Sequence, residues 1–555
     1  MTDSDKERPR LVESGQGLRF LNIEYKNRFL YSKYDPFRSI RGVIESLSLL
    51  EGTLVVICSP GLFYGIDELK RKLPENTFLI AVEADDELAQ ISENCELRKD
   101  NSEIPLFRWS QLELLDEYVR KLCRSGKCRR AVRIDFCAGS AFSPDKYSVI
   151  MAGLTDIIGG FWKNRITLVR MGRMFSRNVF RNIGLRRRSP VLDDVSACVK
   201  KDILVVGAGE SLDSFMFWDE VKAGSFFVIA VDAALIPLKE RGIECDAVVS
   251  LESQSVIDSF YVGVKKSEKT VLFADLCSRN EVCMKFKKRV FFLSEYSPGP
   301  FIDSIKEKNV AGLTVPPLGS VGLAAVYIAL RLRKDEGVNV FTVGLDFSFS
   351  VGATHSKNAP AHIQRLFCTD RKRSVENYDA VFSGAGYFTS DKNNKPVCTT
   401  KILSMYAAQF KNEFSGAANL YDAGKSGLDL GLQRADDDFI RTRLNYLRSD
   451  CSDESCIPDE VFRTDFPQAV EFLNDELEDL ETAASLLSEG EESVFRDSSM
   501  ALEKQIRNLL EKKDYLYLHF PDGFEFNSGI QFLKRLKAEI LFFIKQCKIS
   551  IQNSV

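Results

Sequence analysis

Residues Asp202 to Asp213, with the sequence DILVVGAGESLD, combine the residue types that bind a phosphate at the end of a buried strand. The apolar run from Ile203 to Val206 predicts a strand of a parallel sheet, because an unalternating run needs cover on both faces. Gly207 and Gly209 have no Cβ atom, so the backbone of the turn can come close to a ligand. The free N–H groups and the positive dipole end of a helix beginning at Ser211 would favour an anion. This stretch therefore predicts a phosphate-binding turn.

The identity of the nucleotide depends on the residues around the turn. A dinucleotide-binding turn needs a third glycine, and Leu212 stands at that position. Asp232 ends the next predicted strand, where the ribose-binding acid of such a fold would lie. The pattern therefore favours a mononucleotide over NAD.

A second group of candidates lies further along the chain. The turn at Pro316 to Gly322, with the sequence PPLGSVG, precedes a helix predicted over Leu323–Leu332 and faces an anion in the same way. The next strand runs out at Gly344, Asp346 falls at its carboxyl end, and His355 lies in the polar loop beyond. Ligands of open α/β sheets collect at such strand ends. Spacing alone fits a surface histidine at His355 equally well.

Strands alternate with helices through the centre of the chain, which predicts an α/β fold with a doubly wound, Rossmann-like parallel sheet. The predicted strands are Ile203–Val206, Phe226–Val231, Ala247–Leu251, Thr270–Ala274, Val290–Leu293 and Val338–Val343.

A smaller α/β unit is predicted before the central one. Its strand and glycine turn span Thr53–Gly61, its helix spans Ile66–Leu73, and its second strand spans Thr77–Val82 and ends at Glu83. This order is typical of a nucleotide-binding βαβ unit. The turn carries three bulky residues, Leu62 to Tyr64, and therefore favours a degenerate scaffold over nucleotide binding.

Between these units, Phe161–Arg188 holds nine Lys or Arg residues and no acid. Its apolar spacing predicts a basic connecting helix that Ser189-Pro190 ends. A solvated face and an anion-binding role fit this helix equally well.

The pattern becomes mostly helical after Ala435, which suggests a module for docking a partner or for dimerisation. Within it, Tyr515–Phe526 has the aromatic pattern of a hairpin. We therefore predict an N-terminal α/β domain over residues 1–160, a basic connecting helix over 161–195, a central Rossmann-like domain over 196–435 and a helical C-terminal domain over 436–555.

Composition excludes several classes of protein. The formal charge of -4 argues against nucleic acid as a general partner. No apolar run reaches the roughly 18 residues of a membrane helix. The 14 cysteines are scattered and the start lacks an apolar signal core, so we expect reduced thiols in the cytoplasm. The pairs Cys123/Cys128 and Cys451/Cys456 lack the further ligands of a zinc finger, and we expect no metal.

Four motifs carry a family resemblance: GAGESL at 207–212, AVDAALIPLKERGIECDAVVSLE at 230–252, LGSVGLAA at 318–325 and VGLDFSFSVGATH at 343–355. In this order they resemble the flagellin glycosyltransferases called motility accessory factors, or Maf. They are similar, more distantly, to bacterial sialyltransferases that use CMP-activated sugars. The sialyltransferases have a tyrosine soon after the strand-end Asp-Phe, where this chain has Ser348, and their catalytic histidine lies further along the chain. The role of His355 therefore follows the Maf likeness.

The resemblance implies a role for each candidate. Gly207, Gly209 and Ser211 would face the nucleotide phosphate, Asp232 would lie by the cytidine or ribose, Glu252 would lie near the donor sugar, Gly319 and Ser320 would hold the base or the sugar carboxylate, Asp346 would orient the pocket, and His355 would be the general base.

The implied activity is a cytoplasmic protein O-glycosyltransferase, inverting and metal-independent. It would move a nonulosonic acid, such as pseudaminic or legionaminic acid, from a CMP-activated donor to Ser or Thr of flagellin, as flagellum assembly and motility need. An imidazole near neutral pKa would remove the hydroxyl proton, and backbone N–H groups would stabilise the leaving phosphate. The nucleotide-sugar donor is a substrate, and no cofactor is expected.

Two other functions stay open. A 6-hydroxymethylpterin diphosphokinase is similar in its G-x-G turn, and dependence on ATP and magnesium would distinguish it. A non-catalytic flagellar assembly factor would keep the fold without turnover.

Overall fold

The computed structural model describes residues 8–14, 19–264, 267–294, 299–312, 314–375, 377–382, 384–447, 457–497 and 500–554. The chain divides into two compact units. Unit 1 comprises Met1–Arg170 and Tyr517–Phe526, and unit 2 comprises Met171–Leu516 and Asn527–Val555. The domain boundaries predicted at residues 160, 195 and 435 stay predictions.

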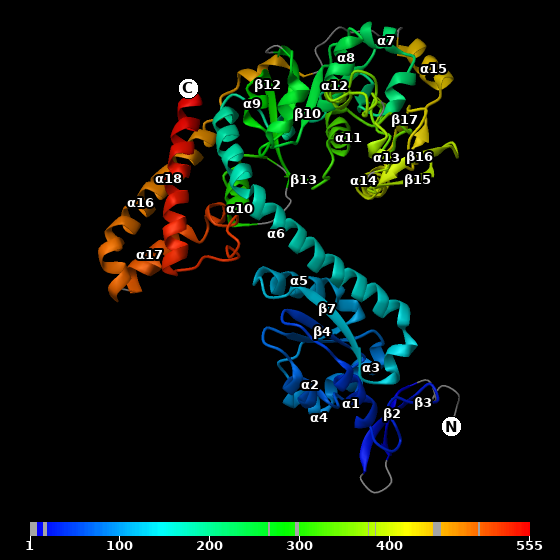
Figure 1. Ribbon diagram of the computed structural model, residues 1–555, viewed down its shortest axis with the longest axis vertical. Coiled ribbons are helices and arrows are strands. Elements are labelled where there is room, and N and C mark those ends of the chain that lie inside the picture. Colours follow the sequence, from blue (N-terminus) through cyan, green and yellow to red (C-terminus); the bar gives the residue numbers. More distant parts are fainter. Residues whose placement is uncertain are drawn as a thin grey trace. The chain divides into compact units, whose positions relative to one another are not determined.

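Unit 1 contains a parallel sheet in the order β6-β5-β4-β7, of which Figure 1 labels β4 and β7. Its strands are β4 (Thr53–Cys58), β5 (Phe78–Glu83), β6 (Leu106–Arg108) and β7 (Arg130–Asp135). Its helices are α1 (Phe37–Ser46), α2 (Ile66–Lys72), α3 (Asp86–Asn94), α4 (Glu96–Asp100) and α5 (Leu112–Arg124). Every residue of β4 is buried, as the apolar run predicts for a strand covered on both faces.

A small antiparallel sheet precedes it, formed by β1 (Arg10–Ser14), β2 (Phe20–Tyr25) and β3 (Arg28–Phe29). Lys26 and Asn27 join β2 to β3 with φ values of 50° and 60°. Two consecutive left-handed residues are the geometry of a type I′ hairpin, whose twist matches that of the strands.

Among its described residues, unit 2 contains one parallel sheet of nine strands, in the order β13-β12-β11-β10-β9-β8-β14-β17-β18. They are β8 (Ile203–Val206), β9 (Phe227–Val231), β10 (Ala247–Ser250), β11 (Ser267–Asp275), β12 (Phe286–Ser294), β13 (Thr314–Val315), β14 (Val340–Val343), β17 (Leu420–Asp422) and β18 (Gln433–Arg434). The predicted doubly wound α/β fold is confirmed. The short strands β13, β17 and β18 escaped prediction because two or three residues carry no pattern.

The chain order reverses at β8, which pairs with β9 on one side and with β14 on the other. Such a reversal is a topological switch point, where ligands of open α/β sheets bind. Around the sheet lie α7 (Trp218–Lys222), α8 (Leu235–Glu240), α9 (Asn280–Cys283), α10 (Pro300–Glu307), α11 (Val321–Leu332), α12 (Pro360–Phe367), α13 (Asp379–Phe382), the hairpin of β15 (Gly386–Ser390) and β16 (Pro396–Thr400), and α14 (Lys401–Phe414).

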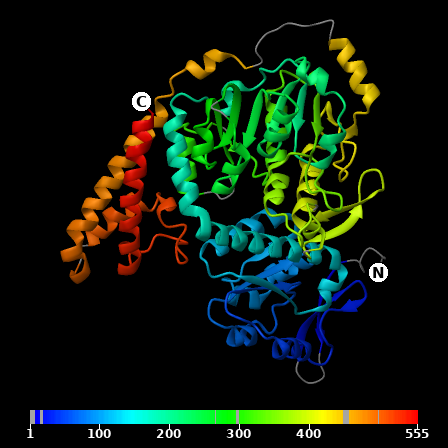
Figure 2. The same ribbon diagram turned by 45° about the horizontal axis from the view of Figure 1, so that its top comes forward.

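The chain after the sheet is helical, as predicted: α15 (Asp437–Leu447), α16 (Gln468–Asp497), α17 (Met500–Leu510) and α18 (Ile530–Asn553). Helices α16 and α18 lie side by side in both views (Figures 1 and 2). Arg443 of α15 donates to the buried carboxylate of Asp202, next to β8, over 2.7 and 3.0 Å. A chain cut at Ala435 would remove this arginine and leave the carboxylate only its hydrogen bonds from Asn339, so we expect the cut to destabilise the sheet.

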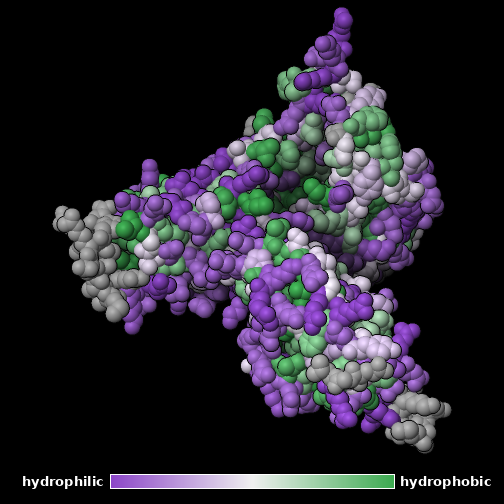
Figure 3. Space-filling view, turned by 60° about the horizontal axis from the view of Figure 1, so that its bottom comes forward, coloured by the Kyte–Doolittle hydropathy of each residue, from purple (hydrophilic) through white to green (hydrophobic). Residues whose placement is uncertain are grey.

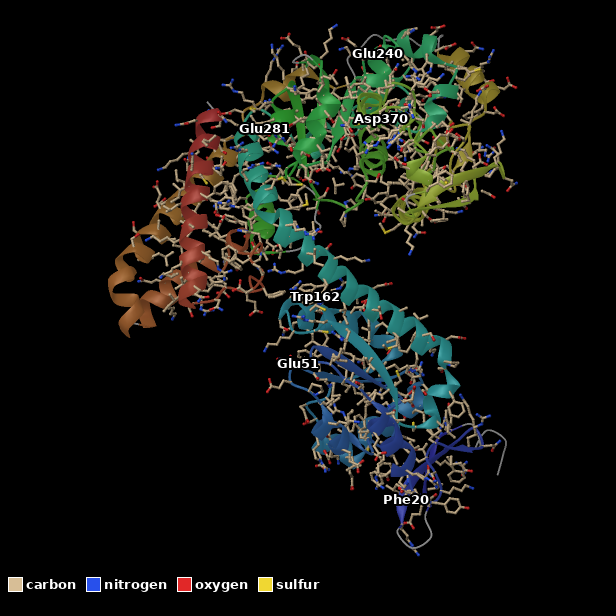
Figure 4. All side chains as sticks on the ribbon, in the orientation of Figure 1. Phe20, Glu51, Trp162, Glu240, Glu281 and Asp370 are labelled. Carbon is tan, nitrogen blue, oxygen red and sulfur yellow. The ribbon has the colours of Figure 1, made fainter. Side chains whose placement is uncertain are left out.

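The hairpin predicted over Tyr515–Phe526 is wrong. The segment forms a 3-10 turn at Asp514–Leu516 followed by further turns, with no strand among its residues. Its aromatic side chains pack into separate clusters, which explains the misleading pattern. Tyr515 contacts Phe301 with ring centroids 4.5 Å apart, whereas Phe524 contacts Trp162, labelled in Figure 4, at 5.8 Å.

The connecting helix is longer than predicted: α6 spans Pro144–Arg186 and begins well before the basic stretch. In unit 2, Gly184 of α6 lies against the backbone of α18, since a Cβ at this position would be 2.5 Å from the carbonyl oxygen of Ser550. The two helices therefore approach more closely here than any other residue would allow.

No helix within the described ranges is long and apolar enough to span a membrane. Hydrophilic residues cover most of the face that Figure 3 shows.

The close contact of α6 with α18 predicts that adding a single methyl group at Gly184 lowers stability. Gly184→Ala should lower the stability of unit 2 by about 1–3 kcal/mol, because the methyl group meets backbone that cannot move aside. Gly160→Ala is the matched control on the same helix, where a Cβ meets nothing within 4 Å, and it should be neutral or stabilising. Thermal unfolding of the full chain measures both, and equal midpoints for the two variants would contradict the close contact.

Candidate functional site

The turns that follow β8 and β14 cross at the switch point. The N–H of Gly207 donates to the carbonyl of Val343 at 2.7 Å, and the N–H of Gly209 donates to the carbonyl of Gly344 at 2.8 Å. A Cβ at Gly207 would collide with the carbonyl of Gly344, and a Cβ at Gly344 would collide with the carbonyl of Gly207. These glycines therefore allow two backbones to meet, before any ligand is considered.

Ser211 joins the two turns through its partner Asp346. Its N–H donates to Oδ2 of Asp346 at 2.7 Å, and its hydroxyl donates to Oδ1. The same hydroxyl accepts the N–H of Gly344 at 3.0 Å. A Cβ at Gly209 would lie 2.5 Å from Oδ2, so this glycine makes room for the carboxylate.

The expected helix with free N–H groups beginning at Ser211 is wrong. The segment is a short 3-10 turn, Glu210–Ser214, and the N–H of Ser211 is held by the chain's own carboxylate. Asp346 thus stands where the sequence pattern places an external anion. The contact links residues 135 positions apart, which no local pattern reveals.

Asp346 lies in a buried group of charges. It is 5% exposed, and nearby Lys392 pairs with Asp422 through side chains that are 6% and 8% exposed. Burial raises the pKa of Asp346 to about 6, against the lowering effect of the two Ser211 hydrogen bonds and of Lys392, while Asp422 raises it. A carboxyl with this pKa changes its protonation near neutral pH when a ligand alters the local charge.

Lys392 and Asp422 are not among the site residues that the sequence predicts. Asp422 ends β17, so the rule that placed Asp346 at a strand end applies to it as well, once that short strand is known. Lys392 lies in the turn between β15 and β16, where a lysine carries no signal of burial.

The loop that carries His355 is tied to the glycine turn. The N–H of Ser356 donates to the carbonyl of Ala208 at 2.9 Å. The N–H of Lys357 donates to Oδ2 of Asp213 at 2.9 Å. The structure therefore brings His355 to the same strand ends as Gly207, Gly209, Ser211 and Asp346, as the sequence predicts.

The ring of His355 is held in a partly buried position. Its Nδ1 lies 3.0 Å from Oγ1 of Thr354, and Nε2 of His362 on α12 lies 2.8 Å from its carbonyl oxygen. Burial lowers the pKa of His355, and the nearby His362 lowers it further. The imidazole is therefore neutral at neutral pH, in the state that accepts a proton.

Asp232 and Glu252 follow the neighbouring strands β9 and β10 and interact electrostatically. The carboxyl of Asp232 accepts the N–H of Ala233 at 2.7 Å. Burial raises the pKa of Asp232 to about 7, and the charge of Glu252 raises it as well. Oε1 of Glu252 accepts the N–H of Gln254 at 2.8 Å.

Gly319 and Ser320 precede α11. Gly319 has φ +69°, and Ser320 is the extended residue before the helix, whose hydroxyl makes no capping hydrogen bond. A Cβ at Gly322 would lie 2.8 Å from the side chain of Leu345, between Gly344 and Asp346 in the chain. The N-terminus of α11 therefore lies beside the turn after β14, with the hydroxyl of Ser320 unused in capping.

Within the part of the chain that the structure describes, no three His, Cys, Asp or Glu side chains are placed to hold a metal ion. Cys123 and Cys128 are free, buried thiols. Cys451 and Cys456 lie outside the described residues.

Comparisons with known proteins give three matches. The family model described as 6-hydroxymethylpterin diphosphokinase MptE-like matches residues 177–352. A protein of Treponema pallidum described as uncharacterized is 30% identical over 561 residues, covering 97% of this chain and 94% of its own. The solved structure of a Maf glycosyltransferase from Magnetospirillum magneticum AMB-1 matches with a TM-score of 0.51 at 14% identity, covering 99% of this chain and 93% of its own. At this identity the last match establishes the fold alone.

The buried carboxyl of Asp232 makes stability depend on pH. Its pKa is about 7 in the folded chain and about 3.9 when unfolded, so its contribution is full below pH 4 and is lost as pH rises through 7. Asp232→Asn stays neutral and should therefore be more stable than the wild type near pH 8, by about 2–4 kcal/mol, with the gain shrinking toward pH 5.

Thermal unfolding between about pH 5 and pH 8 measures this difference. Asp219→Asn is the matched control, because the side chain of Asp219 is 98% exposed, and it should show no pH-dependent gain. A gain of equal size at both pH values would mean that Asp232 is already ionised at low pH.

Proposed function

The chain belongs to the same family as the Treponema pallidum protein and has the fold of a Maf glycosyltransferase, and we propose that it is a glycosyltransferase. One observation supports the proposal most. The bond from Ser356 to Ala208 holds the neutral imidazole of His355 beside the switch-point turn that Asp346 closes. A base at a nucleotide-binding edge is what sugar transfer to a hydroxyl needs.

The donor is a CMP-activated nonulosonic acid, and the acceptor is a Ser or Thr hydroxyl of flagellin, modified in the cytoplasm for flagellum assembly and motility. The four motifs that resemble the Maf proteins support this choice. His355 removes the proton of the acceptor hydroxyl as the oxygen attacks the anomeric carbon, and the sugar inverts as the bond to phosphate breaks.

The charge on the leaving phosphate needs N–H donors. Because the N–H groups of Gly207, Gly209 and Ser211 already bond within the chain, the N-terminus of α11 is the better donor. The hydroxyl of Ser320, which makes no capping hydrogen bond, adds a further hydrogen bond to this group, and the transfer needs no metal. Gly207, Gly209 and Ser211 then support the phosphate site by holding Asp346 in place.

Asp232 and Glu252 complete the donor site on the side of β9 and β10. With a pKa of about 7, the carboxyl of Asp232 is partly protonated near neutral pH. It can therefore accept a hydrogen bond from a ribose or cytidine hydroxyl or donate one to it. Glu252 lies one strand further along, beside the donor sugar.

A second candidate is a 6-hydroxymethylpterin diphosphokinase-like phosphotransferase, favoured by the family match over residues 177–352. That match includes the glycine turn but ends before His355. A non-catalytic flagellar assembly factor is the third candidate, and it would bind without turnover.

Calorimetry with CMP, UMP, GDP and ATP, each with and without a chelator, separates the first two candidates. We expect CMP to bind best and its affinity to be unchanged by the chelator. Chelator-sensitive ATP binding without a CMP signal would favour the diphosphokinase.

Replacing the base tests catalysis directly. His355→Ala should retain CMP affinity but lower sugar transfer about 10²–10⁴-fold. His519→Ala, which lies in unit 1, is the matched control and should transfer normally. Mass spectrometry of flagellin incubated with enzyme and CMP-activated sugar measures both variants.

The pH profile gives a second test of the same residue. Because burial lowers the pKa of His355, the acid limb of kcat/KM should lie below the usual value of about 6.5. An acid limb above that value, or unchanged turnover of His355→Ala, would remove the histidine from the mechanism.

A further inference from the structure

The basic stretch of α6 stays unexplained by the proposed glycosyl transfer. Most of its cations have partners inside their own unit. Arg165 donates to the carbonyls of Leu518 and Phe520, Arg173 pairs with Glu539 at 2.8 Å, Arg181 bonds to Gln546 at 3.0 Å, Arg186 donates to the carbonyl of Val310 at 3.1 Å, and Arg187 pairs with Asp465 at 2.9 Å. These contacts stabilise the fold. Arg177 lacks a contact of this kind, because it pairs with no carboxylate and bonds to no main-chain carbonyl of the described residues.

The turn of α6 that carries Arg177 lies over the carboxyl ends of β10 and β11. The amide of Asn178 donates to the carbonyls of Ser253 and Cys277, both at 3.1 Å. The amide of Asn182 donates to the carbonyls of Leu276 and Ser278 at 2.9 and 2.8 Å. Arg177 is thus fixed at the edge of the sheet where ligands collect.

Arg177 has no carboxylate partner within the described part of the chain. Its one hydrogen bond runs from Nη2 to Oδ1 of the adjacent Asn178 at 3.0 Å. Its Nε is buried and has no partner. A buried donor of a charged group without an acceptor costs stability, and an anion bound at this position would offset that cost.

The charges around Arg177 have a positive surplus. Arg279 pairs with Asp258 at 3.0 Å and with Glu281 at 3.1 Å, and Arg181 also reaches Glu281, which Figure 4 labels beside α6. With Arg173 and its partner Glu539, four arginines face three carboxylates, which leaves one positive charge.

That surplus falls on Arg177. Burial lowers the pKa of Arg177 most, and repulsion by Arg181, Arg279 and Arg173 lowers it further, while only Glu281 among the neighbouring charges opposes them. The wild-type chain therefore holds a repulsive cluster that an anion would relieve.

We propose that Arg177, together with Arg181 and Arg279, binds a carboxylate or phosphate group of a small molecule at the carboxyl ends of β10 and β11. A guanidinium presents a planar fork of N–H donors that matches the oxygens of either group. The proposal concerns residues outside the proposed transfer chemistry and holds whether or not that chemistry does.

The test uses the full chain with inorganic phosphate and with acetate as probes, chloride keeping the ionic strength constant. In thermal-shift titrations, at least one anion should raise the unfolding midpoint of the wild type in a saturable way. Arg177→Gln should lower the affinity for that anion by about tenfold or more, because a charge-assisted contact is lost. The two probes distinguish a phosphate site from a carboxylate site.

Arg187→Gln, in the turn directly after α6, is the matched control, because Arg187 pairs with Asp465, and it should respond to the anion as the wild type does. Without anion, Arg177→Gln should unfold no lower than the wild type, since the change removes repulsion. The proposal is overturned if neither anion gives a saturable shift, or if Arg177→Gln responds as the wild type does.

Discussion

The approach of the β8 turn to the β14 turn sets the geometry of the whole candidate site. Two backbones meet where each carries a glycine, and the carboxylate of Asp346 then bonds to Ser211 on the facing turn. Next to this contact, the N–H of Ser356 donates a hydrogen bond to the carbonyl of Ala208 and fixes the loop that carries His355. A side chain at Gly207 or Gly344 would collide with the facing backbone and push the two turns apart. The stability lost in this way would exceed the contribution of any single hydrogen bond between the turns. The main role of the glycine-rich motif is thus to let the turns after β8 and β14 pack against each other, and the shape of the ligand site follows from that packing.

Apolar runs predicted most of the central sheet, because a strand buried on both faces needs every residue to be apolar, as in Ile203–Val206. The strand-end rule placed Asp346 and His355 at one edge for the same physical reason, since parallel strands present their carboxyl ends together. What stayed hidden depends on which strands are neighbours. Ser211 and Asp346 meet only because β8 and β14 pair, and Lys392 is buried only because its hairpin turn reaches Asp422 of β17.

Two acids of the site share an electrostatic property. Asp346 and Asp232 lie at the ends of different strands, and burial raises the pKa of both toward neutrality. The fold therefore retains carboxyl groups that water would ionise fully, and their burial costs stability, as is common at ligand-binding sites. A ligand that donates a hydrogen bond to either group, or brings it a positive charge, recovers part of that cost on binding.

The path of the chain through unit 1 has a consequence for biosynthesis. Arg165 donates to the carbonyls of Leu518 and Phe520, and a Cβ at Gly126 would lie 2.7 Å from the ring of Phe524. A ribosome therefore finishes nearly all of unit 2 before the last piece of unit 1 is made. Until then the nascent unit 1 exposes the surface around Trp162 that Phe524 later covers. Such an interval invites aggregation or chaperone binding during translation.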